Sequence, residues 1–307
     1  MKSDQLGSQS DLWSDWLLHR RHADDPEYER CVRAEIERYA DRVLDGAQLA
    51  PGMALVDIGT GEGLVAFRAI DRIGPSLRVL LTDISAPMLR HVEALAVQRE
   101  VRHQCTFLQC SAEQLKDIGD ASVDAVTTRA ALAYVPDKKA AVREFHRVLK
   151  PGGRISIAEP ILRDDAIKAC ALRKFVDSAP PQSQNPFMPL LHRWKAAQFP
   201  DTREKMSKSP ITNYSERDLL RLVEDSGFAD IHLELHIDVR PSRITSWEVF
   251  LDCSPHPWAP PPRVILAEQF SAEERQIFER VLRPSVEAGR SLTTDRIVFL
   301  TARKPSA

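Results

Sequence analysis

The apolar residues of the chain fall into two kinds of pattern that alternate along its length. Short apolar runs, which are typical of buried strands, are separated by stretches in which apolar residues recur at helical spacing. Repeated alternation of strands and helices predicts a parallel sheet with right-handed crossovers. The predicted strands are 54–58, 77–83, 105–110, 123–128 and 154–160, followed after a gap by 231–239 and 296–302.

Two lapses in this alternation divide the chain. Residues 162–211 and about 240–292 break the strand–helix order and contain many prolines, which indicates insertions into a sheet domain. Before the first strand, helices are expected at 11–22 and 26–45. The expected organisation is a helical lid (1–50), a core (51–161), a lid or substrate insertion (162–211) and the rest of the core (212–303), which carries a Pro-rich and helical insertion at about 240–292.

The composition excludes several classes of function rather than indicating one. Lys and Arg total 42 against 44 Asp and Glu, so the formal net charge of −2 lacks the basic surplus of a general nucleic-acid binder. No apolar stretch approaches the roughly 18 residues of a membrane span. The five cysteines form no CxxC pair, which favours reduced thiols in the cytoplasm, and no cluster of metal ligands is visible.

The clearest local signal is the sequence VDIGTGEG at 56–63, between the first predicted strand and the next helix. Glycines at such a turn let a ligand approach the backbone closely. A dinucleotide site requires a third glycine at position 64, which is Leu64, and the P-loop pattern is absent. A glycine turn alone is equally a tight turn without a ligand. The acids Asp57, in the first strand, and Asp83, ending the second, favour a ligand site.

Five motifs, in order, resemble those of class I S-adenosylmethionine-dependent methyltransferases, particularly the ubiquinone/menaquinone C-methyltransferase-like small-molecule branch. They are VDIGTGEG, LLTDIS, LQCSAEQL, DAVTTRAALAYVPD and RVLKPGG. The resemblance is close over 51–161 and weak over 212–239 and the last strand. It implies an α/β fold with a Rossmann-like, seven-stranded, mostly parallel sheet, helices on both faces and an antiparallel last strand.

The resemblance also implies S-adenosylmethionine as the cofactor. Its methionine portion would lie over the backbone of Gly59 and Gly61, and Asp83 would accept hydrogen bonds from both ribose hydroxyls. Asp57 would either orient the loop or reach the ammonium group. Ser111 stands where the family usually has an Asp for the adenine amino group, so that contact lacks charge unless Glu113 compensates. The implied cofactor residues are Asp57, Gly59, Thr60, Gly61, Asp83, Ile84, Met88, Ser111, Ala112, Glu113 and Arg129.

Substrate contacts and catalysis leave more alternatives open. Arg129 is expected to bind the cofactor carboxylate or an acidic substrate, or to form a surface salt bridge. Glu159, which ends the fifth strand, is the candidate general base or substrate-hydroxyl ligand, with helix capping as the alternative. Trp16, Tyr134 and Trp194 are candidate substrate contacts under a lid that excludes water, or else simply pack in the core.

The expected function is methyl transfer from S-adenosylmethionine to O, N or C of a small organic molecule, without a nucleic-acid, membrane or metal partner. Two alternatives remain. One is an RNA or protein methyltransferase, for which a basic stripe in 192–208 is the hint. The other is a catalytically silent cofactor-binding scaffold, against which the glycine loop and Asp83 argue. The sequence KMSKS at 205–209 matches an aminoacyl-tRNA synthetase loop, but the partner motif HxGH is missing, so a solvated basic loop is expected.

Overall fold

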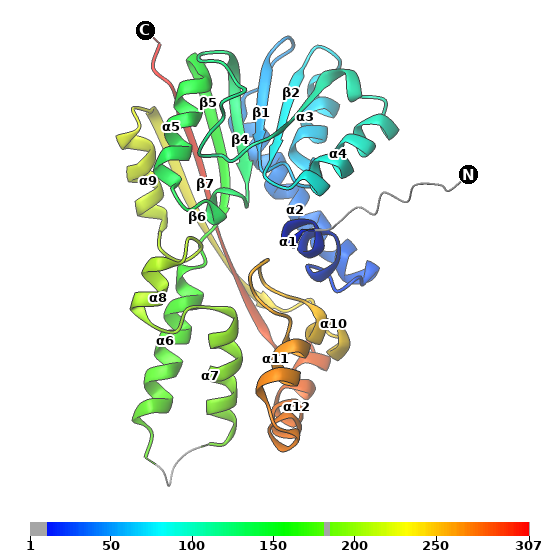
Figure 1. The fold of residues 1–307 in the computed structure, drawn as a ribbon, viewed down its shortest axis with the longest axis vertical. Coiled ribbons are helices and arrows are strands. Elements are labelled where there is room, and N and C mark those ends of the chain that lie inside the picture. The colour runs from blue at the N-terminus through cyan, green and yellow to red at the C-terminus, as the bar shows by residue number, and fades with distance from the viewer. Residues whose placement is uncertain (1–10, 181–184, 307) are drawn as a thin grey trace, which may run out of the picture.

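The computed structural model describes residues 11–180 and 185–306, which are organised around one seven-stranded sheet (Figure 1). The strand order is β3-β2-β1-β4-β5-β7-β6, and β7 runs antiparallel to both of its neighbours. The seven strands predicted from the pattern and the reversed last strand implied by the resemblance are both confirmed. The strands are β1 (Ala54–Ile58), β2 (Arg78–Asp83), β3 (Cys105–Gln109), β4 (Val123–Arg129), β5 (Leu149–Pro160), β6 (Ala229–Pro241) and β7 (Leu292–Arg303).

The central strand β1 is buried along its whole length, which explains why its sequence is an almost unbroken apolar run. Its parallel pairing places Ile58 beside Thr82 of β2 and Thr128 of β4. The β2–β3 pair ends at Asp83 beside Gln109. Because parallel strands end at one edge of a sheet, the loops that follow β1, β2 and β4 converge there.

Helices cover both faces of the sheet (Figure 1). They are α2 (Pro26–Ala47), α3 (Leu64–Ile73), α4 (Ala86–Gln98), α5 (Lys138–Val148) and α9 (Glu216–Asp225). On one face α2, α3 and α4 pack against the strands through an apolar cluster that includes Leu44, Phe67 and Val92. On the other face α5 and α9 contribute Phe145 and Leu219 to a second cluster. The sheet is therefore shielded on both sides, and only its edges are open to a ligand.

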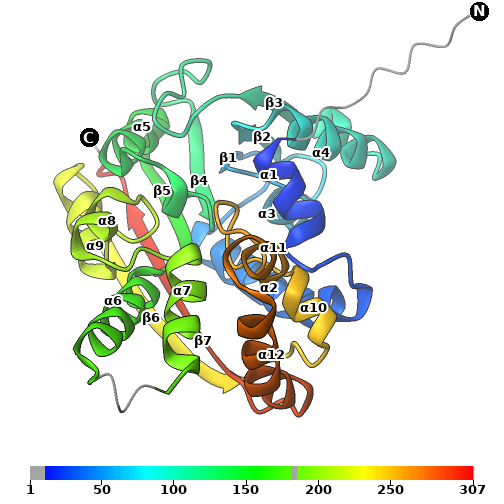
Figure 2. The same ribbon diagram turned by 60° about the horizontal axis from the view of Figure 1, so that its bottom comes forward.

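The two insertions form a separate helical part beyond the sheet (Figures 1 and 2). Its helices are α6 (Arg163–Ser178), α7 (Phe187–Gln198), α8 (Arg203–Lys208), α10 (Trp247–Asp252), α11 (Pro262–Gln269) and α12 (Ala272–Glu287). Helix α7 of the first insertion packs on α11 and α12 of the second around a cluster that includes Trp194 and Phe278. Two segments that are distant in the sequence therefore share one core.

A two-stranded ribbon carries the second insertion away from the sheet. Strand β7 pairs with β5 only from Ile297 onward, whereas its pairing with β6 begins already at Leu292, opposite Pro241. The ends of β6 and β7 therefore continue past the sheet edge and reach the outer helices (Figure 1).

The KMSKS segment differs from its expectation. Lys205 and Lys208 belong to the short helix α8 rather than to a loop, and both are neutralised locally. The Nζ of Lys205 lies 2.8 Å from Asp201, and the Nζ of Lys208 lies 2.6 Å from Glu204. The pairing follows from the i,i+4 spacing of acid and base on one helical face.

The N-terminal segment forms a helix whose winding changes. Asp11 caps α1 (Leu12–Asp15), which continues as a π-helix, η1 (Trp16–Arg20), in place of the single α-helix predicted over 11–22. Short 3-10 turns follow later, η2 (Arg102–Gln104) and η3 (Leu132–Tyr134). Among the helices of residues 11–180 and 185–306, none combines the length and the apolar composition needed to cross a bilayer.

Candidate active site

The glycine loop between β1 and α3 adopts a conformation that only glycine adopts easily. Gly59 has a φ of +62°, and a Cβ built on it would lie 2.4 Å from the Cβ of Ala131. The loop is tied back to β2 by a hydrogen bond of 2.9 Å from the Thr60 N–H to the Thr82 carbonyl. The backbone at Gly59 is therefore fixed in a cradle with no room for a side chain.

Asp57 lies beneath this loop rather than in the space above it. Its buried carboxylate accepts hydrogen bonds from the hydroxyls of Thr60 (2.8 Å) and Thr127 (2.9 Å). Burial raises the pKa of Asp57 to about 6, although both hydroxyls oppose the shift. Of the two roles expected for this residue, the position fits the orientation of the loop.

Asp83 ends β2 and reaches the glycine loop from the side. One carboxylate oxygen accepts a hydrogen bond of 3.0 Å from the Gly61 N–H, and the other accepts one of 3.0 Å from the Ser85 N–H. Ser85 caps α4 through its own hydroxyl, so helix capping does not require the carboxylate. Burial, which dominates, together with the nearby Asp11 raises the pKa of Asp83. The carboxylate stays accessible from the space above the loop.

That space is a cavity of about 180 Å³, called the loop cavity below. Its floor is the glycine loop, and its far side is made by residues after β2 and β3, including Met88 and Ser111. Trp13, Trp16 and Leu17 of the N-terminal helix lie on its other side. Of the residues expected at the cofactor or substrate, those lining it are Trp16, Gly59, Thr60, Gly61, Asp83, Ile84, Met88, Ser111, Ala112, Arg129 and Tyr134.

Glu113 and Glu159 do not line the loop cavity. The Glu113 carboxylate accepts hydrogen bonds from the Ser111 hydroxyl (3.1 Å) and the Asp137 N–H (2.7 Å), so it braces the loops around the site. Ser111 therefore reaches the cavity while Glu113 supports it from behind.

Glu159 is fully buried and serves the turn that follows β4. Its carboxylate accepts a hydrogen bond of 3.0 Å from the Thr128 hydroxyl. It also accepts backbone hydrogen bonds from Ala131 (3.2 Å), Leu132 (3.1 Å) and Ala133 (3.0 Å). Burial raises its pKa against these four bonds. The arrangement matches the helix-capping alternative, with η3 as the capped turn, and leaves no oxygen directed at a reacting group.

A second, larger cavity of about 900 Å³ adjoins the first and is called the outer chamber below. The two share the lining residues Trp16, Arg21, Arg129, Ala130 and Tyr134. The outer chamber is enclosed by α2, α6, α7, β7 and the second insertion. Trp194, expected at the substrate, lines the outer chamber and not the loop cavity.

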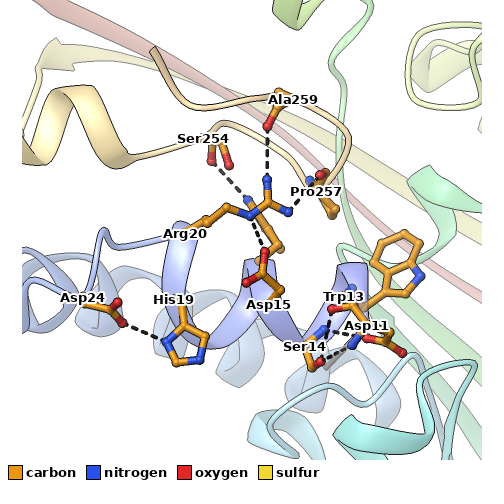
Figure 3. A network of polar contacts seen from close by, with 11 residues as sticks. Asp11, Trp13, Ser14, Asp15, His19, Arg20, Asp24, Ser254, Pro257 and Ala259 are labelled. Atoms are coloured by element: carbon orange, nitrogen blue, oxygen red, sulfur yellow. Dashed lines mark hydrogen bonds and ion pairs between the residues drawn. The ribbon is translucent and has the colours of Figure 1, made fainter. Parts of the chain in front are cut away.

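The second insertion, which the sequence did not identify as a pocket wall, lines the outer chamber and also holds the N-terminal helix over the loop cavity. Ser254 lines the outer chamber, and its backbone carbonyl accepts a hydrogen bond of 3.1 Å from the Trp16 indole N–H. The Arg20 guanidinium donates to the carbonyls of Pro257 (3.2 Å) and Ala259 (3.4 Å) (Figure 3). These contacts fasten the N-terminal helix to a segment more than two hundred residues away.

Aromatic rings add a second contact between the N-terminal helix and the second insertion. Trp13, Tyr134 and Trp258 meet edge to face, with ring centroids 5.2 to 6.1 Å apart. Edge-to-face packing of this kind adds to the apolar contact itself. Trp258 brings the proline-rich segment of the second insertion against Tyr134, which stands beside the glycine loop.

Two cavity residues were missed in the sequence, Arg21 and Lys195. Arg21 follows Trp16 and Leu17 at helical spacing, a signal that could have placed it on their face. Lys195 is half-buried, with its Nζ 3.9 Å from the centroid of the Trp194 ring, and burial lowers its pKa to about 8. Within the described residues, no cluster of His, Cys, Asp and Glu side chains is placed to hold a metal ion.

Known proteins resemble the part of the chain that carries this site. Residues 56–157 match the family model of a methyltransferase domain. A nocamycin O-methyltransferase of Saccharothrix syringae is 34% identical over 47% of this chain and 52% of its own. A ubiquinone/menaquinone biosynthesis C-methyltransferase of Nitrobacter hamburgensis is 39% identical over 34% of this chain and 42% of its own. The chain thus spans about half the length of the curated relatives it matches.

Solved structures share the fold over a longer stretch. The YcgJ protein of Bacillus subtilis superposes with a TM-score of 0.53 at 16% identity, covering 88% of this chain and 99% of its own. The [4+2]-cyclase SpnF superposes with a TM-score of 0.50 at 21% identity, covering 88% and 82%. Residues 56–157 therefore match a methyltransferase domain, and the curated relatives aligned with this part of the chain are methyltransferases.

Proposed function

We propose that the chain transfers the methyl group of S-adenosylmethionine to an O, N or C atom of a small organic molecule. The observation that carries the proposal is the direct junction between the loop cavity and the outer chamber, which share five lining residues. One space suits the donor, and the other, about 900 Å³ in volume, suits an acceptor of small-molecule size.

The donor residues are proposed from the shape of the loop cavity. The glycine cradle, in which a Cβ on Gly59 would clash with Ala131, fits the methionine portion of the cofactor. Asp83 is placed to accept hydrogen bonds from ribose hydroxyls. Ile84, Met88 and Ser111 surround the adenine end. When bound, the cofactor supplies an electrophilic methyl group on a sulfonium.

The remaining task of the protein is alignment in a space with little water. Methyl transfer is an in-line displacement, so a fixed approach of the acceptor lowers the barrier. Tyr134 and Trp16 lie at the junction of the two cavities, where they can hold the acceptor against the donor. We propose that residues 11–30 and 185–200 form the cover that keeps water out.

A macromolecular acceptor is less well supported. The basic stripe in 192–208 is largely neutralised, since Arg193 pairs with Glu274 at 2.9 Å and Lys205 with Asp201 at 2.8 Å. The outer chamber is lined by residues of several helices and of the second insertion. All five cysteines are unpaired thiols, which supports a cytoplasmic location.

The experiment uses donor labelled in its methyl group and cell extract divided by size. Label should appear in molecules below a cutoff of about 3 kDa and not in RNA or protein, as expected for a ligand that fits an enclosed pocket. Transfer to the large fraction alone would overturn the proposal. Calorimetric binding of S-adenosylhomocysteine without transfer to either fraction would support the silent scaffold instead.

A further inference from the structure

Two arginines line both cavities at their junction. Arg21 follows the π-helix of the N-terminal segment, and Arg129 ends β4. Both line the loop cavity and the outer chamber. The Arg21 guanidinium lies over the Trp16 ring, 5.6 Å from its centroid. Within residues 11–180 and 185–306, neither guanidinium has an ion pair or a hydrogen bond to a carboxylate.

Several other half-buried arginines in the described part of the chain are paired. Arg240 contacts Glu35 and lies 2.6 Å from Asp295, and Arg68 lies 2.7 Å from Asp41. Buried charges are costly to a fold unless a counter-charge or a ligand compensates them. The contrast marks Arg21 and Arg129 as groups whose partner comes from outside the chain.

The nearby acids are already engaged. Glu62 acts on both arginines electrostatically but lies 3.5 Å from Arg33. The carboxylates of Asp57 and Glu159 accept hydrogen bonds from side chains or backbone around them. Of the five residues that line both cavities, two are arginines and none is an acid, so the shared lining has an excess of positive charge. Burial and the neighbouring Arg21 accordingly lower the pKa of Arg129 to about 10.

The donor neutralises at most part of this excess. S-adenosylmethionine carries one carboxylate, but it also carries an ammonium and a sulfonium, so its own net charge is positive. Binding it beside two guanidinium groups increases the need for a negative partner. The acceptor is the remaining molecule at this junction.

We infer that the methyl acceptor carries an anionic oxygen group, a carboxylate or a phenolate, which Arg21 and Arg129 bind at the junction of the two cavities. The inference rests on the proposed function and names the class of its acceptor. The rest of the acceptor would lie in the outer chamber against apolar side chains such as Ile36, Leu172 and Phe250. Forked N–H donors suit a planar oxyanion, and positive charge favours the ionised form of a phenol.

An ionised acceptor also explains why a free base is dispensable. Glu159, the base candidate from the sequence, is committed to four hydrogen bonds. An acceptor that binds as the anion has no proton to lose at the attacking oxygen. The guanidinium groups are then positioning groups for the acceptor.

The first test compares two probes of one shape, 2-naphthoate and 2-naphthamide, on protein saturated with S-adenosylhomocysteine. Calorimetry should show naphthoate binding at least about tenfold more tightly, as expected for hydrogen bonds to a charged group. Arg21→Gln and Arg129→Gln should each remove most of that preference, and Arg→Lys at either position should restore part of it. Lys139→Gln, which removes an exposed cation outside both cavities, should leave it intact.

Equal binding of the two probes, or binding of neither, would overturn the inference. So would a preference that survives both arginine substitutions. If the arginines serve only the donor carboxylate, their substitution would weaken S-adenosylhomocysteine but not 5′-methylthioadenosine, which lacks that carboxylate, and would leave the naphthoate preference unchanged.

The second test finds the natural acceptor class. Small-molecule extract is passed over a strong anion exchanger at pH 5 and at pH 11, and each fraction is offered with labelled donor at neutral pH. A carboxylate acceptor should be retained at both pH values, and a phenol only at pH 11. Label confined to unretained molecules would overturn the inference while upholding the proposed function. Absence of label everywhere would count against the proposed function, and the probe measurement would still decide the anion site.

Discussion

The loop cavity and the outer chamber share a boundary, but they differ in whether their polar groups already have hydrogen-bond partners within the protein. In the loop cavity, Asp83 and Thr60 already bond to the backbone or side chains of the same loops. In the outer chamber, three residues have a buried polar atom without a partner in the described part of the chain. These atoms are His22 Nε2, Trp194 Nε1 and Ser254 Oγ.

The difference indicates how each cavity recognises a ligand. A site whose polar groups are fixed beforehand by its own backbone suits one unchanging ligand, the cofactor. Unpaired buried groups are uncommon in folded proteins and leave hydrogen-bonding capacity for a ligand. His22 contributes as a neutral imidazole, because burial, followed by the nearby Arg21, lowers its pKa to about 4. Acceptor specificity should therefore depend on the outer chamber and donor affinity on the glycine loop.

The largest effect is expected where the loop cavity has least room. Gly59→Ala should weaken binding of S-adenosylhomocysteine by at least about 100-fold, because the new Cβ would lie 2.4 Å from the Cβ of Ala131 at a φ of +62°. Gly74→Ala is the matched control, with a φ of +88° and nothing within 4 Å of its Cβ. Calorimetry on both variants separates steric clash from backbone strain. Equal losses in the two would show that the cradle does not hold the donor.

The second prediction uses the buried acid beneath the loop. The pKa of Asp57 rises from 3.8 to about 6 on folding, so the folded state holds its proton to higher pH than the unfolded chain. Between these two values the unfolded chain binds fewer protons, and stability falls as pH rises. Relative to Asp57→Asn, the free energy of unfolding of the native chain should fall by about 3 kcal/mol between pH 3.5 and 6.5 and should fall no further above that.

Denaturant unfolding at several pH values measures this difference. Asp117→Asn, which removes an exposed carboxyl, controls for the loss of one acid and should show no such slope. If the difference in unfolding free energy between the native chain and Asp57→Asn does not change with pH, the loop is not supported by a protonatable buried carboxyl.

Asp83 provides the third and smaller effect. Asp83→Ala should weaken binding of S-adenosylhomocysteine and 5′-methylthioadenosine alike, by about 1.5–3 kcal/mol, because both ligands carry the ribose. Glu113→Gln is the comparison variant, since this carboxylate lies behind Ser111 and outside the cavity lining. It should change the affinity less than threefold. Unaltered affinity in Asp83→Ala would place the ribose elsewhere.

The two cavities also differ in how far the sequence predicts them. The glycine loop and the acids Asp57 and Asp83 lie at strand ends, so local pattern and motif order were sufficient to bring them together. The outer chamber depends on contacts such as that between Trp16 and Ser254, which no local pattern encodes. For the same reason the second insertion was not identified as a pocket wall.

Glu159 illustrates an intermediate case. Its place at the end of β5 was predictable, but a strand-end carboxylate serves equally as a base or as a cap. Only the three-dimensional path of residues 131–133 shows which backbone N–H groups reach it. Arg21 shows the reverse, since a polar helix residue is normally solvated and becomes a cavity residue only because the second insertion covers its helix.

The smallest effect on ligand affinity is expected at the junction of the two cavities. Trp16→Phe keeps an aromatic ring there but removes the hydrogen bond of 3.1 Å to the Ser254 carbonyl. A single neutral hydrogen bond contributes about 1 kcal/mol, so S-adenosylhomocysteine should bind more weakly by at most about fivefold. His19→Ala, on the exposed face of the same helix, should bind as the native chain does.

Hydrogen exchange shows whether this change acts through the cover. In the native chain, adding S-adenosylhomocysteine should slow exchange in 57–63 and 83–88 and also in 11–30 and 185–200, because local opening of the cover exposes its backbone amides. In Trp16→Phe, protection of 57–63 should persist while that of 11–30 falls, since the ligand still contacts the loop but the helix has lost one attachment to the second insertion. Protection confined to the loop and the end of β2 in the native chain would mean that the two cavities close independently, and that the N-terminal helix is a fixed wall rather than a cover.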